Sequence, residues 1–392
     1  MTEPAHSLLG ASSAHRWLSC PGSFKLSQSA PHRPASIYAA TGTLAHEFIE
    51  QQTKSQGFSR LPVGELGQTY QRDGHSITVD RELIDGVNRM LDYLFDAAVS
   101  ADWVDIEFRV DLAGYFPEPP PVPVFGTVDA AALISPVLEV IDYKNGAGVM
   151  VTPVENPQLM FYAAGVLDLL PQAARDQVER IKLTVVQPHA IGVPPVRSWE
   201  ISVIDLLLWV DEVLVPGVAH CARDDAPLVP GDWCRFCPVV HACPALYGAA
   251  VKAAQSEFGD DDPPTDPGDL AHWLDVAERA ELWITRLREH AVDQLEHQVR
   301  IPGWGLVPTR ATRQWLAPDS DIAEKLQELG ATHDEVWETR VRSPAQIEKQ
   351  LNRTRKGKRV WDMARSLAEA RSSGVKLGRD TSTNAREDFT DE

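Results

Sequence analysis

An aspartate–lysine pair in an apolar run near the middle of the chain has the spacing of a hydrolytic metal site. Asp142 and Lys144 are two residues apart, so on a β-strand their side chains point to the same face. A preceding strand that ends near Asp129 could place a second carboxylate beside Asp142. Neighbouring carboxylates repel each other unless a cation lies between them, and all-oxygen ligation suits Mg²⁺ or Mn²⁺.

Such a site has the chemistry of phosphodiester hydrolysis. A divalent cation would lower the pKa of a bound water and polarise the scissile phosphate. Lys144, one step along the same strand face, would orient the attacking water or stabilise charge that develops in the transition state.

Two further polar pairs flank this stretch. Residues 41–50 predict the start of a helix on which His46 and Glu50 are four residues apart and therefore share a face. Downstream, Gln158 and Tyr162 have the same spacing on a second predicted helix, which begins with Asn156 as its cap.

Taken in this order, the motifs resemble those of the PD-(D/E)XK nucleases, and specifically of the RecB and AddB types. The resemblance implies a DNA nuclease, and specifically an exonuclease. Asp142 stands where many members of the class have Glu. It implies a Mg²⁺ or Mn²⁺ site whose ligands are His46, Asp129, Asp142 and the backbone carbonyl of Tyr143. It also implies catalytic roles for Lys144, Gln158 and Tyr162.

A second function, from a different class, stays open at this point. A DNA-binding or assembly protein could keep the nuclease fold after its chemistry has lapsed, and it would bind DNA without metal-dependent cleavage. Every expected catalytic position is filled in this sequence, which favours the enzyme.

The cysteines form a second constellation. Three are grouped as Cys-x₂-Cys-x₅-Cys, and a fourth lies about two hundred residues upstream; they are Cys234, Cys237, Cys243 and Cys20. Four thiolates are the usual complement of a [4Fe–4S] cluster. The alternative is structural Zn²⁺, with His241 in place of Cys20 as the fourth ligand. One cysteine before the nuclease motifs and three after them resembles the AddB-type and CRISPR-associated exonucleases, and this favours iron–sulfur. Cys221 lies outside the spacing and is expected to be an ordinary thiol.

The charge of the chain limits how it can contact DNA. The formal net charge is −19, which argues against a generally basic binding surface. Contact should therefore be confined to a cation site and to small basic patches. The candidate patch is a basic run near the C-terminus that contains Arg353, Arg355, Lys356, Lys358 and Arg359. The sequence shows no secretory signal and no membrane-spanning stretch, and five cysteines without such a signal favour metal over disulfides.

The elements that must position these residues alternate in type. Helices are expected at residues 81–99, 157–170 and 203–214, and strands at 103–110, 124–134, 137–143 and 181–187. The three earlier strands suggest an antiparallel meander. The fold class is α/β with a small mixed sheet flanked by helices, and the resemblance implies a restriction-endonuclease-like PD-(D/E)XK core.

We expect four segments along the chain. Residues 1–255 form the nuclease domain, which the cysteine cluster closes, and residues 256–268 form a linker rich in charge and proline. Residues 269–375 form a mainly helical C-terminal region, with a long amphipathic helix at 270–299. Residues 376–392 form a flexible tail with little apolar content.

The resemblance extends to a family of phage and prophage proteins related to these nucleases. It is carried by residues 12–23, 141–146 and 156–162, and more loosely by residues 343–349. It implies a role in phage or prophage DNA replication or recombination, by trimming DNA ends. It also implies a single-strand-binding or annealing protein as a partner, and the cytoplasm of a bacterial host as the location.

Overall fold

The computed structural model describes residues 7–28, 30, 35–146, 149–257, 266–302 and 304–305. The chain divides into two units, Met1–Leu306 and Val307–Glu392, and the described residues all lie in the first. The main helices are α1 (Ala14–Ser19), α2 (Gly22–Ser27), α3 (Ile37–Gln56), α4 (Arg81–Ser100), α5 (Pro157–Leu169), α6 (Gln172–Arg175), α7 (Val203–Trp209), α8 (Val215–Ala222), α9 (Pro244–Glu257) and α10 (Pro267–Glu296). The strands are β1 (Thr69–Arg72), β2 (His75–Thr78), β3 (Trp103–Asp111), β4 (Phe125–Ile134), β5 (Val137–Tyr143), β6 (Arg180–Val186) and β7 (Val196–Ser202).

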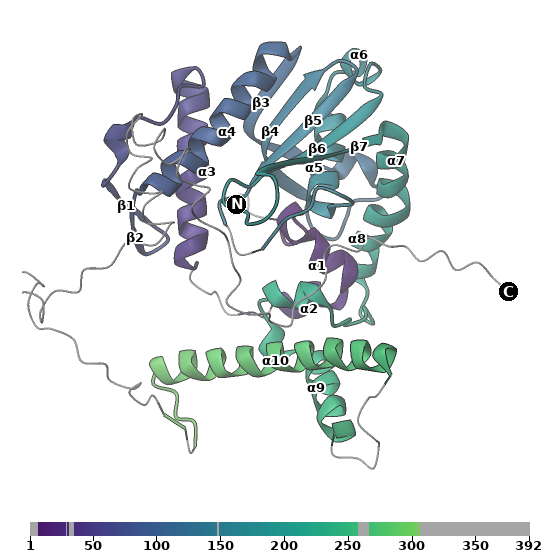
Figure 1. Cartoon of the computed structure of the whole chain (residues 1–392). Helices are drawn as coiled ribbons and strands as arrows, with labels where there is room; N and C mark the ends of the chain where they lie inside the picture. The colour runs from purple at the N-terminus through teal and green to yellow at the C-terminus, as the bar shows by residue number, and fades with distance from the viewer. Residues whose placement is uncertain are drawn as a thin grey trace, which may run out of the picture. The chain divides into compact units, whose positions relative to one another are not determined.

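A five-stranded mixed sheet is the centre of the fold (Figure 1). Its strand order is β3-β4-β5-β6-β7, in which β5 and β6 are parallel and the other neighbours are antiparallel. The predicted α/β class with a small mixed sheet is therefore confirmed, and so is the β3-β4-β5 meander. Strand β7 and the separate β1–β2 hairpin were not predicted.

Helices cover both faces of the sheet. On one face α3 and α4 pack their apolar stripes against Ile141 and Tyr143 of β5. On the other face α5 packs against Leu138 and Val140 of the same strand, together with α1, α7 and α8. Strand β5 is thus buried on both sides, which explains its continuous apolar sequence. Among the described helices, none combines the length and the apolarity that a bilayer crossing requires.

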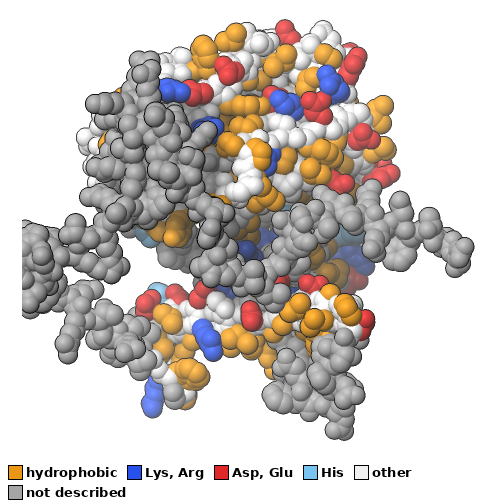
Figure 2. Space-filling model, in the orientation of Figure 1, with side chains coloured by type: hydrophobic (Ala, Val, Ile, Leu, Met, Phe, Trp, Pro, Cys, Tyr) orange, Lys and Arg blue, Asp and Glu red, His pale blue; other side chains and the backbone are white. Residues whose placement is uncertain are grey.

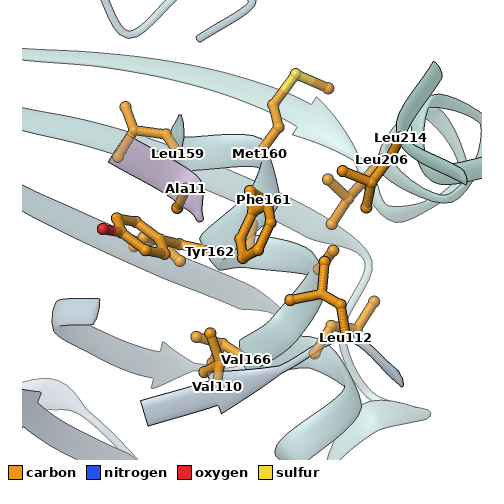
Figure 3. Packing of buried hydrophobic residues seen from close by; sticks show 14 of the residues in the cluster. Ala11, Val110, Leu112, Leu159, Met160, Phe161, Tyr162, Val166, Leu206 and Leu214 are labelled. Carbon is orange, nitrogen blue, oxygen red and sulfur yellow. The ribbon is translucent and has the colours of Figure 1, made fainter. Parts of the chain in front are cut away.

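Helix α5 lies in the core beside the sheet (Figure 3). The predicted start is confirmed, because the Asn156 side chain accepts from the amides of Gln158 and Leu159, and Pro157 occupies the first turn. The helix is apolar on almost every side, as buried helices are. Gly165 allows the close approach of β3, since a Cβ at this position would lie 2.6 Å from Val110 Cβ.

Helix α3, which carries His46, begins at Ile37 and not at Thr41 as predicted. Ser36 is the cap, and its hydroxyl accepts from the Ala39 amide at 3.2 Å. The Thr-Gly-Thr segment that suggested a start lies inside the helix, where the Thr41 hydroxyl donates back to the Ile37 carbonyl at 2.8 Å. Packing of the buried face of α3 outweighs the weak helix propensity of these residues.

Two helices follow the cysteine segment. The predicted helix at 270–299 is confirmed as α10, which packs against α9. Arg286 of α10 donates to the Arg235 carbonyl at 2.8 Å, and this bond ties the helix to the segment between Cys234 and Cys237. Most of the expected linker and all of the expected tail lie outside the described residues, and the four expected segments stay predictions.

Candidate functional site

Three acidic residues form a row across three adjacent strands. Ile106 pairs with Ala130 and Phe108 with Val128, so the register places Glu107 of β3 opposite Asp129 of β4. The pairing of Ala130 with Ile141 likewise extends to Asp129 opposite Asp142 of β5. Residues opposite each other on neighbouring strands lie close together. The sheet therefore gathers negative charge at this row.

His46 of α3 lies against the row. Its Nδ1 is 2.9 Å from Glu107 Oε1 and 3.7 Å from Asp129 Oδ1. The three residues His46, Glu107 and Asp129 each offer one metal-ligand atom, and these three atoms lie within 4.8 Å of one another. They could therefore hold a metal ion together. The structure thus brings together two of the predicted cation ligands, His46 and Asp129, and adds Glu107.

Glu107 was missed by the sequence analysis. Its backbone has φ = +47°, a left-handed conformation that is costly for a residue with a side chain. The Lys54 side chain of α3 donates to the Glu107 carbonyl at 3.1 Å and also pairs with Glu50 at 3.0 Å. Glu50, which shares the helix turn with His46, therefore braces Glu107 through Lys54.

The acidic surroundings change the protonation of His46. Burial favours the neutral imidazole, but Asp129, Glu107 and Asp142 outweigh it and raise the pKa of His46 to about 9. The imidazole is therefore protonated at neutral pH in the absence of a cation. A histidine ligates metal only in its neutral form, so a bound cation must displace this proton.

Buried Asp142 and half-buried Lys144 form an ion pair at the end of β5. Lys144 Nζ lies 2.9 Å from Asp142 Oδ2, and the Asp142 side chain is only 3% exposed. Burial raises the pKa of Asp142 to about 6, and Lys144 opposes this shift. Burial lowers the pKa of Lys144, but Asp142 and Asp129 outweigh it and raise that pKa, so the lysine stays charged.

The predicted glutamine–tyrosine pair lies beside this lysine. Lys144 Nζ donates to Gln158 Oε1 at 3.2 Å, and Gln158 Nε2 donates to the Tyr162 hydroxyl at 3.2 Å. Burial raises the pKa of Tyr162, so its phenol remains neutral. Gly126 of β4 makes room for the ring, because a Cβ there would lie 2.8 Å from Tyr162 Cε1.

Tyr143, which follows Asp142 in the chain, binds the Asp129 carboxylate through its backbone amide. Its amide donates to Asp129 Oδ2 at 2.7 Å, which holds that carboxylate beside β5. Its ring packs edge-on against the His46 imidazole, with 5.6 Å between the ring centroids. The role of the Tyr143 carbonyl as a cation ligand stays a prediction.

A buried glutamine, also missed by the sequence analysis, fastens the loop that follows Lys144. Gln187 Nε2 donates to the carbonyls of Gly146 and Val149 at 2.7 and 2.8 Å, and Gln187 Oε1 accepts from the Val151 amide at 3.1 Å. Arg197 completes the set by donating to Gln187 Oε1 at 2.7 Å. The loop joins β5 to α5, so Gln187 supports the positions of both Lys144 and Gln158.

The four predicted cluster ligands line one cavity, together with Arg16, Ser23 and several apolar residues. They are Cys20, Cys234, Cys237 and Cys243. The Val229 amide donates to Cys20 Sγ at 3.2 Å, and the Gly231 amide donates to Cys234 Sγ at 3.4 Å. Burial outweighs the Gly231 amide and raises the pKa of Cys234 to about 11, so without a metal this residue is a thiol and metal binding would release its proton.

The spacing of these sulfurs bears on which metal they fit. Among the described residues, no three of the four cysteine Sγ atoms lie within 4.8 Å of one another. Tetrahedral zinc with bonds of about 2.3 Å would hold its sulfurs only about 3.8 Å apart. A cluster in which each cysteine binds a different iron requires wider spacing. His241 is absent from the residues that line this cavity and stacks on His290 instead, with 4.1 Å between the ring centroids.

Cys221 differs from the other cysteines. It is fully buried, its Sγ lies 3.5 Å from the Trp17 carbonyl, and it is not among the residues that line the cavity. Burial raises its pKa to about 12, so the residue remains a thiol. The expectation that Cys221 is not a ligand stays a prediction.

Basic side chains are scattered on the face of the molecule drawn in Figure 2. On the face drawn in Figure 2, Lys and Arg stand singly among acidic and apolar side chains. The basic run predicted to contact DNA, from Arg353 to Arg359, lies outside the described residues.

The chain belongs to the DUF2800 family, described as a protein of unknown function, whose family model matches residues 6–372. Among solved structures, it is similar to one described as "Crystal structure of SSO0001", at 13% identity and a TM-score of 0.23. That match covers 59% of this chain and 96% of the other. A TM-score of this size supports no conclusion about fold or function.

Proposed function

We propose that the chain is a metal-dependent DNA nuclease with a PD-(D/E)XK core of the RecB and AddB type. The observation that carries the proposal is the acidic row Glu107–Asp129–Asp142, with His46 on one side and the charged Lys144 on the other. A carboxylate cluster beside a protonated histidine and a half-buried lysine suits the binding of a divalent cation and of a phosphate.

Within this proposal the ligands of Mg²⁺ or Mn²⁺ are His46, Asp129 and Asp142, with Glu107 as an additional ligand. A cation held there would activate water and polarise the scissile phosphate. Glu107 and Asp129 would hold the cation through their carboxylate oxygens, and His46 would join them only in its neutral form, which requires the loss of the proton that these carboxylates now favour.

The lysine and its neighbours act on the phosphate. Lys144 remains protonated, so it donates to a phosphate oxygen and does not serve as the base. Gln158 fixes the Lys144 ammonium, and the neutral Tyr162 fixes Gln158 in turn. This chain of hydrogen bonds holds the donor where negative charge develops as the phosphorus–oxygen bond breaks.

The exonuclease assignment and the role in phage or prophage replication or recombination rest on the resemblance of the sequence motifs. The same resemblance supports a single-strand-binding or annealing protein as a partner in the bacterial cytoplasm. The acidic chain supports DNA contact that is concentrated at the cation site and depends strongly on the cation.

The proposed second cofactor is a [4Fe–4S] cluster on Cys20, Cys234, Cys237 and Cys243. Their common cavity supports one shared metal centre, and the resemblance of the cysteine pattern favours iron–sulfur over zinc. The cluster would join the segment after α1 to the segment before α9, and its role is structural because hydrolysis transfers no electrons. Brown protein with broad visible absorption is the expected result of anaerobic purification, whereas colourless protein with stoichiometric zinc would contradict it.

The experiment is anaerobic digestion of end-labelled single-stranded DNA, end-labelled double-stranded DNA and a circular control. With Mg²⁺ or Mn²⁺ we expect the linear substrates to shorten from their ends while the circle survives. Cleavage of the circle would replace the exonuclease assignment with an endonuclease. DNA binding without cleavage in either cation would support the lapsed, non-catalytic alternative and overturn the proposal.

A further inference from the structure

The cavity lined by the four cysteines also contains two buried donors without acceptors. Arg16 Nε and Ser23 Oγ are shielded from solvent, and neither has a hydrogen-bond partner within the part of the chain that the structure describes. Both residues line the cavity with the cysteines. A buried donor without an acceptor costs free energy, so two in one cavity point to a bound group that accepts hydrogen bonds there.

The chemistry of the cavity indicates that this group is anionic. Four thiolates outweigh the charge of either Zn²⁺ or [4Fe–4S]²⁺, so a centre on these cysteines carries net negative charge. The Arg16 side chain lines the same cavity as all four sulfurs, so its guanidinium is placed to compensate this negative charge.

Short helices hold the two donors on either side of Cys20. Arg16 lies on α1 and Ser23 on α2, and the Ser23 amide donates to the Cys20 carbonyl at 2.9 Å. The Gly22 amide donates to the Pro227 carbonyl at 2.9 Å, and a Cβ at Gly22 would lie only 2.7 Å from the Ala226 carbonyl oxygen. This close approach fixes α2 against the segment whose Val229 amide donates to Cys20, so Ser23 is held beside the cavity before any group binds.

We infer that Arg16 and Ser23 donate hydrogen bonds to sulfur atoms of the iron–sulfur cluster and thereby raise its reduction potential. The inference rests on the proposed cluster and is independent of the proposed nuclease activity. Donors and positive charge stabilise the reduced cluster more than the oxidised one, because reduction adds negative charge to the sulfurs.

The test uses the full chain, purified anaerobically with its cluster, as wild type, Ser23→Ala, Arg16→Met and Ser27→Ala. Ser27 is the matched control, because its hydroxyl lies on the same helix, is also buried without a partner among the described residues, and does not line the cavity. Iron and zinc content and the circular dichroism spectrum are measured first. The midpoint potential is then found by titration with titanium(III) citrate, which supplies one electron per cluster.

We expect Ser23→Ala to lower the reduction equilibrium constant and Arg16→Met to lower it at least tenfold, which is 59 mV for one electron. Ser27→Ala should leave the potential unchanged. Unchanged potentials in both Ser23→Ala and Arg16→Met, equal shifts in all three variants, or a wild-type cluster that titanium(III) fails to reduce would overturn the inference. Zinc in place of iron would overturn the cofactor proposal itself, and loss of DNA cleavage alone would bear on neither.

Discussion

The protonation of His46 leads to a quantitative expectation for cation binding. With a pKa of about 9, His46 is neutral in about 1% of molecules at pH 7.0 and in about 24% at pH 8.5. Only the neutral imidazole ligates, so the affinity for Mn²⁺ should rise with pH and level off above the pKa. The rise between pH 7.0 and 8.5 should be about 25-fold, whereas a histidine with an ordinary pKa of 6.5 would give about 1.3-fold.

Isothermal titration calorimetry of cation-free protein under anaerobic conditions measures this dependence. Repeating the titration in buffers of different ionisation enthalpy gives the protons released, which should be about one per Mn²⁺ at pH 7.0. The matched variant is His46→Asn, which should bind Mn²⁺ more weakly and with little dependence on pH. Equal wild-type affinity at both pH values, or a steep dependence that persists in His46→Asn, would refute the reasoning.

Three further predictions concern the surroundings of the site. Glu107→Gln removes one of the charges that raise the pKa of His46, so the pH dependence of Mn²⁺ affinity should weaken and the affinity above pH 9 should fall; an unchanged calorimetric profile would exclude Glu107 from the site. Gln187→Ala removes the side-chain hydrogen bonds to the Gly146 and Val149 carbonyls and should lower the free energy of unfolding by about 1 to 2 kcal/mol in urea, with a fall in kcat; full stability would show that the loop does not depend on this side chain. Asn156→Ala should cost about 1 kcal/mol in the same assay while Asn156→Asp costs much less, and equal losses would contradict the capping role.

Local patterns were sufficient to predict the centre of the fold. Strand β5 has the bounds expected from its apolar run, and α5 begins where Asn156 and Pro157 predicted, because cap chemistry and strand alternation act over a few residues. The Asp73-Gly74 turn of the β1–β2 hairpin is an equally local signal, since both residues have positive φ, and it was overlooked. Strand β7 is half-exposed and polar, so its pairing with β6 could not be inferred from hydrophobicity.

The residues missed in the site depend on register over long separations. Glu107 lies opposite Asp129 because of the register in which β3 pairs with β4. The long connection between the two strands does not fix this register, so the sequence alone did not predict it. The acidic alternation of Asp105 and Glu107 within an apolar strand was the available signal. Gln187 offered no comparable signal, because its partners are backbone groups of a loop about forty residues upstream.

The most direct measurement of the proposed site compares variants of Asp142 and Lys144 with a control variant of Lys182, which lies on the neighbouring strand β6. Lys182 of β6 contacts buried Glu139 at 3.2 Å, so Lys182→Met disrupts an acid–lysine pair of similar exposure in the same sheet but outside the site. In anaerobic digestion of end-labelled DNA with Mn²⁺, Asp142→Asn and Lys144→Met should each lose at least about 100-fold in rate, with circular dichroism unchanged. Lys182→Met should keep the wild-type rate. Undiminished cleavage by Asp142→Asn and Lys144→Met would contradict the assignment of the active site.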